Sequence, residues 1–260
     1  MSDFPKFVEF REEGPREGFQ IEKKISPIEE RVELIDMLSE TGWKRRQVGS
    51  FVSPQYVPQM ADTGTLFQRI KRKPGVNYTS LWLNDKGFRK ALTAHEVDID
   101  PRLLFYPSEA FAQSNNNCSS AEMREKQRDW VRLYKEEGYT VDAAYVMTAF
   151  GCNFEGAISQ ERILDDFRFI LELCEEENIP VPILVVADTM GWGNPEAVKR
   201  MIGALRDMTP QARIGMHIHD TLGLGIANLH SAPSMGVDMF ESPFRRLCGC
   251  PFAGPRQSPR

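Results

Sequence analysis

Residues 181–187 constrain the fold more than any other segment, because Val-Pro-Ile-Leu-Val-Val-Ala is almost continuously apolar. A strand that is buried on one face alternates apolar and polar side chains, whereas a parallel strand covered on both faces reads as an apolar run. The run is far shorter than the roughly 20 apolar residues of a membrane span. It therefore predicts an interior parallel strand of an α/β protein.

Strand-like and helical segments alternate along the chain. Strands are predicted at residues 7–10, 47–52, 78–83, 102–106, 141–148, 181–187, 213–218 and 237–241. Helices are predicted at residues 27–38, 121–137, 160–176, 195–208 and 226–235. Ser26 and Asn194 are expected to cap the helices that begin at Pro27 and Pro195. This order fits a (β/α)8 TIM barrel formed by one domain over residues 1–260, although a doubly wound open sheet has the same alternation.

Composition and charge narrow the function classes. The chain has 32 basic and 37 acidic residues and a net charge of −5, which does not favour nucleic-acid binding. Its five cysteines show no CxxC spacing, so a reducing compartment is expected. The first six residues lack the features of a signal peptide, and no apolar run approaches a membrane span. We therefore expect a cytoplasmic protein without a membrane partner.

His217 and His219 give the strongest local signal for chemistry. Residues i and i+2 of a strand point to the same face, so both imidazoles can bind one metal ion, with a carboxylate from another strand as a third ligand. Chemistry in a barrel lies at the carboxyl ends of the strands, where this pair falls. His95 and His230 have no such context and are interpreted as surface or packing residues.

Four other polar residues have both a functional and a structural interpretation. Arg16 and Glu17 are expected in a loop that reaches the barrel mouth, but spacing alone favours a solvated ion pair. Asp188 follows the apolar strand, as a catalytic carboxylate does, although it could also cap the next loop. Cys250 lies beside glycine and proline, where either acid–base work or simple burial is consistent with the sequence.

Several motifs together resemble the 3-hydroxy-3-methylglutaryl-CoA lyase family, from about residue 7 to residue 253. Gly-Pro-Arg-Glu-Gly-Phe-Gln, at residues 14–20, is similar to the opening motif of that family. Further matches follow in family order at residues 50–54, 57–62, 115–119, 151–156, 188–191, 217–221 and 249–253. Claisen condensation enzymes share the same barrel and metal site in the wider superfamily, and residues 50–54 and 249–253 favour the lyase branch.

The resemblance implies a retro-Claisen cleavage of an acyl-CoA substrate to acetyl-CoA and acetoacetate. It implies a Mg²⁺ or Mn²⁺ ion held by Glu17, His217 and His219, with His217 also counted among the catalytic residues. Arg16 would stabilise the enolate, Cys250 would protonate it, and Asp188 would transfer protons or orient the site. Ser50, Tyr145 and Thr189 are expected to contact the substrate. A homodimer or a higher homo-oligomer is expected.

The sequence departs from the family pattern at three places. Glu17 replaces an aspartate, Gln47 replaces an acidic residue, and no asparagine follows Asn228 to supply a further metal ligand. Residues 254–260 form a divergent tail, so the last barrel helix is expected to be missing. Two alternatives therefore stay open, a Claisen-type acyltransferase and a catalytically inactive relative that binds a ligand or partner.

Overall fold

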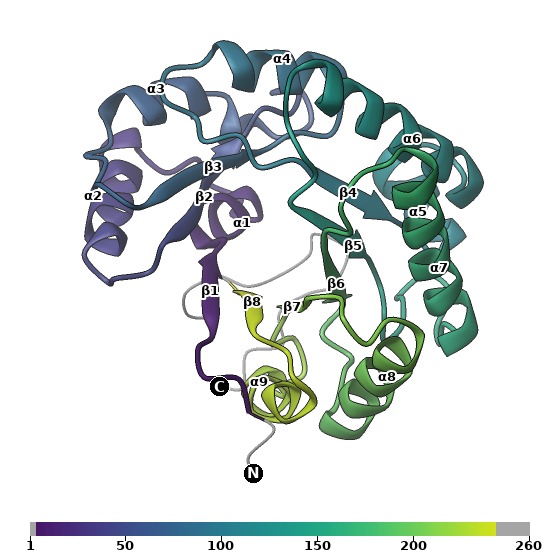
Figure 1. Ribbon diagram of the computed structural model, residues 1–260. Coiled ribbons are helices and arrows are strands. Elements are labelled where there is room, and N and C mark those ends of the chain that lie inside the picture. Colours follow the sequence, from purple (N-terminus) through teal and green to yellow (C-terminus); the bar gives the residue numbers. More distant parts are fainter. Residues whose placement is uncertain (1–3, 243–260) are drawn as a thin grey trace. The chain divides into compact units, whose positions relative to one another are not determined.

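The computed structural model describes residues 4–242, in which short strands alternate with helices (Figure 1). The strands are β1 (Glu9–Glu12), β2 (Arg45–Ser50), β3 (Asn77–Leu81), β4 (Arg102–Phe105), β5 (Ala143–Val146), β6 (Ile183–Asp188), β7 (Ile214–Ile218) and β8 (Met239–Ser242). The α-helices are α1 (Gly14–Gln20), α2 (Ile28–Ser39), α3 (Thr63–Arg69), α4 (Asp85–Thr93), α5 (Glu109–Asn116), α6 (Ser120–Glu136), α7 (Gln160–Glu176), α8 (Pro195–Met208) and α9 (Gly225–Ser231). Two 3₁₀ turns, η1 (Pro58–Met60) and η2 (Ala232–Met235), complete the described elements.

The chain forms two compact units, one containing Pro101–Phe240 and the other Glu9–Asp100. In the smaller unit, β1, β2 and β3 are parallel neighbours. The pairing of β2 with β3 shifts between Gln47 and Gly49, which marks a bulge near the carboxyl end of β2. In the larger unit, β4, β5, β6 and β7 follow one another in a parallel sheet. Parallel pairing within a unit brings the carboxyl ends of its strands to one edge, where side chains from different strands can meet.

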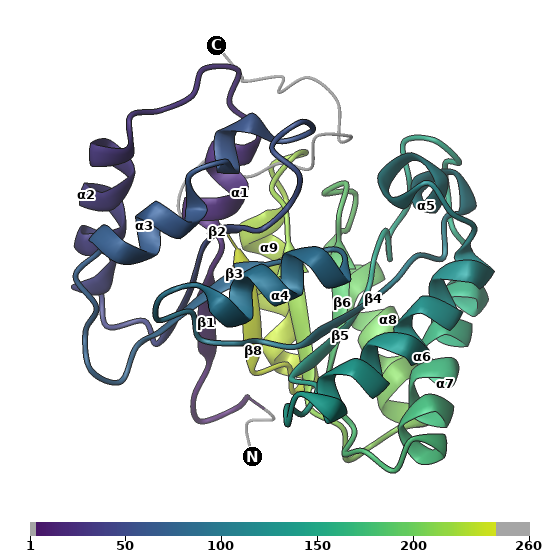
Figure 2. The same ribbon diagram turned by 90° about the horizontal axis from the view of Figure 1, so that it is seen from above.

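The larger unit confirms the interpretation of the apolar run. Every residue of β6 is buried, as expected for a strand covered on both faces. Helices α6, α7 and α8 lie along the outer face of the β4–β7 sheet (Figures 1 and 2). Helix α7 turns Ile163, Phe167 and Ile170 inward, each fully buried, because this spacing places them on one side of the helix. Burial of these apolar faces holds the helices on the sheet.

The smaller unit has a core of its own under α2 and α3. Ile35 of α2 and Phe67 of α3 pack with Val48 of β2 and Tyr78 of β3. Arg46 is also buried here. Its guanidinium donates a hydrogen bond of 2.7 Å to the Leu38 carbonyl oxygen and lies 5.4 Å from the centre of the Tyr78 ring. A charged group tolerates such burial only with polar partners, so Arg46 fixes the end of α2 against β2.

Most predicted elements are present, with small shifts at their ends. The predicted boundaries of α7 and α8 match those observed, and Asn194 caps α8 by accepting a hydrogen bond from the Ala197 amide at 3.0 Å. The prediction for Ser26 was wrong, because Pro27 itself is the N-cap, with extended backbone angles of −54° and 142°. The strand predicted at residues 7–10 lies two residues later. Two further predictions, the absence of the last helix and the divergent tail at residues 254–260, fall outside the described residues. Within residues 4–242, no helix is long and apolar enough to cross a membrane.

Candidate functional site

His217 and His219 are brought together at the carboxyl end of β7, as the strand alternation predicts. Their Nε2 atoms lie 3.0 Å apart, and both rings are buried. The Nδ1 atom of His219 lies 2.7 Å from the Thr189 carbonyl oxygen. A carbonyl oxygen only accepts hydrogen bonds, so this contact places a proton on Nδ1 and leaves the Nε2 lone pair of His219 available.

This geometry suits two ligands of one cation. Two bonds of about 2.1 Å that meet at a right angle hold their donor atoms about 3.0 Å apart. Histidines that bind metals almost always donate their other ring N–H to a carbonyl or a carboxylate, as His219 does. Within the larger unit, the residues present therefore fit a divalent metal centre.

Asp188 ends β6 and closes the loop that follows. Its two carboxylate oxygens accept hydrogen bonds from the backbone N–H groups of Trp192 at 2.9 Å and Gly193 at 3.0 Å. Burial raises the pKa of Asp188 to about 6, while the hydrogen bonds from Gly193 and Trp192 and the nearby histidines act in the opposite direction. The structure thus supports the loop-capping interpretation, and it leaves a carboxyl group that can exchange a proton near neutral pH.

Thr189 connects two strand ends with the histidine pair. Its hydroxyl oxygen accepts a hydrogen bond from the Thr148 amide at 2.8 Å, and its carbonyl oxygen holds His219. Tyr145 of β5 is buried in a cluster with Ile183 and other apolar side chains, and the Arg102 guanidinium lies 5.3 Å from the centre of its ring. Thr189 is therefore in contact with His219, one of the two candidate metal ligands, while Tyr145 packs among apolar side chains of β5 and β6.

Arg16 and Glu17 lie on α1, where a loop was expected. The helix forms because Pro15 suits a first turn and the Glu12 carboxylate accepts a hydrogen bond from the Gly14 amide at 2.7 Å. Both functional candidates are largely buried, and Arg16 Nη1 lies 3.5 Å from Glu17 Oε1. The solvated ion pair that the spacing favoured is therefore wrong.

Two further residues fix the Arg16 guanidinium. Its Nη2 atom donates to Glu13 Oε2 at 2.6 Å, and its Nε atom donates to Gln47 Oε1 on β2. Glu13 was not among the residues singled out from the sequence, and Gln47 was noted only as a departure from the family pattern. The spacing of three residues between Glu13 and Arg16 would have indicated this contact, had the helix been recognised.

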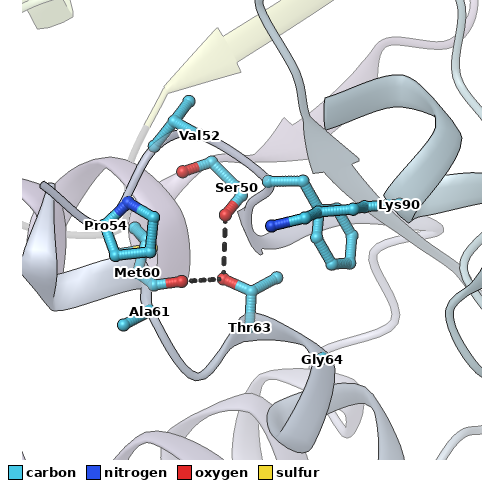
Figure 3. Close-up of a pocket in the computed structure, with 9 residues that line it drawn as sticks. Ser50, Val52, Pro54, Met60, Ala61, Thr63, Gly64 and Lys90 are labelled. Atoms are coloured by element: carbon cyan, nitrogen blue, oxygen red, sulfur yellow. Dashed lines mark hydrogen bonds between the residues drawn. The ribbon is translucent and has the colours of Figure 1, made fainter. Parts of the chain in front are cut away.

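Ser50 lies at the carboxyl end of β2, beside a cavity of about 230 Å³ (Figure 3). The Thr63 hydroxyl donates to the Ser50 carbonyl oxygen at 3.0 Å and to the Met60 carbonyl oxygen at 2.8 Å. The Lys90 side chain extends toward the same cavity. The Ser50 hydroxyl is buried and has no hydrogen-bond partner among residues 4–242. Cys250, the predicted proton donor, lies outside the described residues.

Comparisons with known proteins give consistent results. The family model described as HMGL-like matches residues 8–244. A mitochondrial hydroxymethylglutaryl-CoA lyase from Bos taurus is 37% identical over 254 residues, which cover 97% of this chain and 75% of that protein. The crystal structure of hydroxymethylglutaryl-CoA lyase from Pseudomonas aeruginosa has a TM-score of 0.85 and 33% identity, covering 96% of this chain and 81% of that one. An HMG-CoA lyase from Acinetobacter baumannii, solved with coenzyme A and 3-methylmalate, has a TM-score of 0.83 and 31% identity, covering 97% and 79%. These similarities confirm the (β/α)8 barrel fold.

Proposed function

Because this chain belongs to the HMGL-like family and is a carbon–carbon lyase, we propose that it cleaves 3-hydroxy-3-methylglutaryl-CoA, or a closely similar acyl-CoA, to acetyl-CoA and acetoacetate. The observation that carries the proposal is the buried pair of His217 and His219, whose Nε2 atoms lie 3.0 Å apart. Similarity to hydroxymethylglutaryl-CoA lyases supports the substrate, and coenzyme A in the Acinetobacter baumannii lyase supports a CoA thioester.

We propose a divalent cation, Mg²⁺ or Mn²⁺, as the cofactor, with Glu17, His217 and His219 as its protein ligands. Glu17 stands where the family motif has an aspartate, and the longer side chain keeps the carboxylate that such ions prefer. When bound, the cation would act as a Lewis acid on the hydroxyl and a carbonyl or carboxylate oxygen of the substrate.

The proposed reaction is a retro-Claisen cleavage. The tertiary hydroxyl loses its proton, its oxygen forms the ketone of acetoacetate, and the electron pair of the broken C–C bond passes to the thioester enolate. Asp188 is proposed to exchange the hydroxyl proton, because its pKa of about 6 suits proton transfer near neutral pH. Arg16, held by Glu13 and Gln47, is proposed to stabilise the enolate charge. Cys250 would then protonate the enolate carbon to give acetyl-CoA.

Ser50, Tyr145 and Thr189 are proposed to contact the substrate. We also propose that residues 1–260 act as one lyase domain, that the protein is a homodimer or higher homo-oligomer, and that it works in the cytoplasm.

Cleavage of 3-hydroxy-3-methylglutaryl-CoA by the purified 260-residue chain tests the proposal directly. Acetyl-CoA should appear with Mg²⁺ or Mn²⁺, disappear with EDTA, and fall at least about 100-fold in His217→Ala, because a ligand of the cation is lost. His230→Ala is the matched control, since this histidine of α9 is exposed whereas the pair is buried, and it should keep wild-type activity.

The other outcomes separate the alternatives. Mn²⁺ binding without any acetyl-CoA would contradict this substrate and favour an inactive relative or a different acyl-CoA. A condensation product formed from acetyl-CoA and a keto acid would favour an acyltransferase.

A further inference from the structure

Thr148 follows β5 in a backbone conformation that its side chain disfavours. Its φ angle is +52°, in the left-handed region, which a β-branched residue rarely adopts. Asn117 and Asn178 also have positive φ angles, but asparagine tolerates this region. Thr148 is fully buried, so the strain is not a feature of a solvent-exposed turn.

Hydrogen bonds to the end of β6 hold the backbone in this conformation. The Thr148 amide donates to Thr189 Oγ1 at 2.8 Å, and the Ala149 amide donates to the Ala187 carbonyl oxygen at 3.0 Å. The carbonyl oxygen of the same Thr189 accepts a hydrogen bond from the His219 ring N–H. A single residue, Thr189, therefore connects Thr148 with the histidine pair. Thr148 lies at the edge of the sheet where barrel chemistry occurs.

The Thr148 hydroxyl is buried and has no hydrogen-bond partner in the part of the chain that the structure describes. Buried polar groups in native proteins nearly always have a partner, and exceptions require a reason. Valine would fill the same volume without a hydroxyl to satisfy. Strain and an unsatisfied hydroxyl in one residue, beside a candidate metal centre, are typical of a functional site.

We propose that Thr148 is a substrate-binding residue, whose hydroxyl donates a hydrogen bond to an oxygen atom of the substrate's acyl group. The proposal deepens the proposed lyase function and rests on it. It assigns a role to the unsatisfied hydroxyl and explains why Thr148 is held against Thr189, whose carbonyl oxygen contacts the His219 ring.

The test replaces Thr148 by valine and by serine. Thr148→Val should raise the melting temperature of the ligand-free protein by about 2–4 °C, because an unsatisfied buried hydroxyl is removed. The same variant should raise KM for the acyl-CoA about tenfold and leave kcat within about twofold, because the lost contact is made in the ground state. Thr148→Ser keeps the hydroxyl and should keep KM within about threefold of the wild type.

Thr93→Val is the matched control for the chemical change. Thr93 is an exposed residue of α4, and its hydroxyl donates to the Arg89 and Lys90 carbonyl oxygens. Its removal should not raise the melting temperature and should leave KM unchanged.

The outcomes distinguish this proposal from the proposed function. A wild-type chain that does not cleave 3-hydroxy-3-methylglutaryl-CoA overturns both. A wild-type chain that cleaves it, together with an unchanged KM in Thr148→Val, overturns the role of Thr148 alone. A lower melting temperature in Thr148→Val also overturns it, because the hydroxyl would then have a structural partner.

Discussion

Replacement of Asp188 by asparagine should change how the stability of the metal-free protein depends on pH. The carboxyl group is buried at the end of β6 and accepts hydrogen bonds from the Trp192 and Gly193 amides. Burial raises its pKa from 3.8 to about 6 despite those bonds. Asparagine has a similar shape and does not titrate, so the comparison isolates the ionisation of this one group.

The sign follows from the direction of the pKa change. The folded protein binds the proton more tightly than the unfolded chain does, so the contribution is fully present below about pH 4. As the pH rises, the unfolded chain loses its proton first, and the free energy of unfolding falls until the folded carboxyl group has also ionised. An increase in pKa from 3.8 to about 6 corresponds to a fall of roughly 3 kcal/mol.

Urea unfolding of the EDTA-treated protein at several values between about pH 4 and pH 7 measures this difference. Over that range, the free energy of unfolding of the wild type should fall by roughly 3 kcal/mol relative to Asp188→Asn. Asp129→Asn, which alters a carboxylate that is 78% exposed, should follow the wild type. Parallel curves for the wild type and Asp188→Asn would refute the reasoning, because the Asp188 carboxyl group would then titrate alike in both states.

Two further changes test the geometry of the loop and of the arginine. Gly193→Ala should lower the melting temperature by several degrees, because an added Cβ would lie 2.7 Å from Asp188 Oδ2. The control is Gly203→Ala in α8, where an added Cβ meets nothing closer than 3.6 Å. This variant should be neutral or stabilising in the same thermal scan. Arg16→Lys should reduce kcat about 100-fold with an unchanged circular dichroism spectrum, because an ammonium group cannot reproduce the guanidinium contact with Gln47; near-wild-type kcat would remove Arg16 from the chemistry.

The parts of the fold that follow from local rules were predictable from the sequence. The β6 strand is an uninterrupted apolar run because it is covered on both faces, and α7 shows its buried stripe at helical spacing. Helix α1 was missed because it has seven residues, four of which are Gly14, Pro15, Arg16 and Gly18, so it shows no apolar period. The Glu12 carboxylate and the first-turn proline start it, and neither is visible as a periodic pattern.

In the candidate site, too, only the features that follow from local rules were predictable from the sequence. His217 and His219 could be paired from the sequence because a strand repeats every two residues, whatever surrounds it. The conformation of Thr148 could not, because its φ of +52° is imposed by hydrogen bonds to Thr189 and Ala187, about 40 residues further along the chain. The tautomer of His219 depends on the same region, since the Thr189 carbonyl oxygen fixes the ring proton. The end of β6 therefore determines both the tautomer of the imidazole that could bind a cation and the conformation of the strained threonine. A change in this one loop should thus alter metal affinity and substrate affinity together.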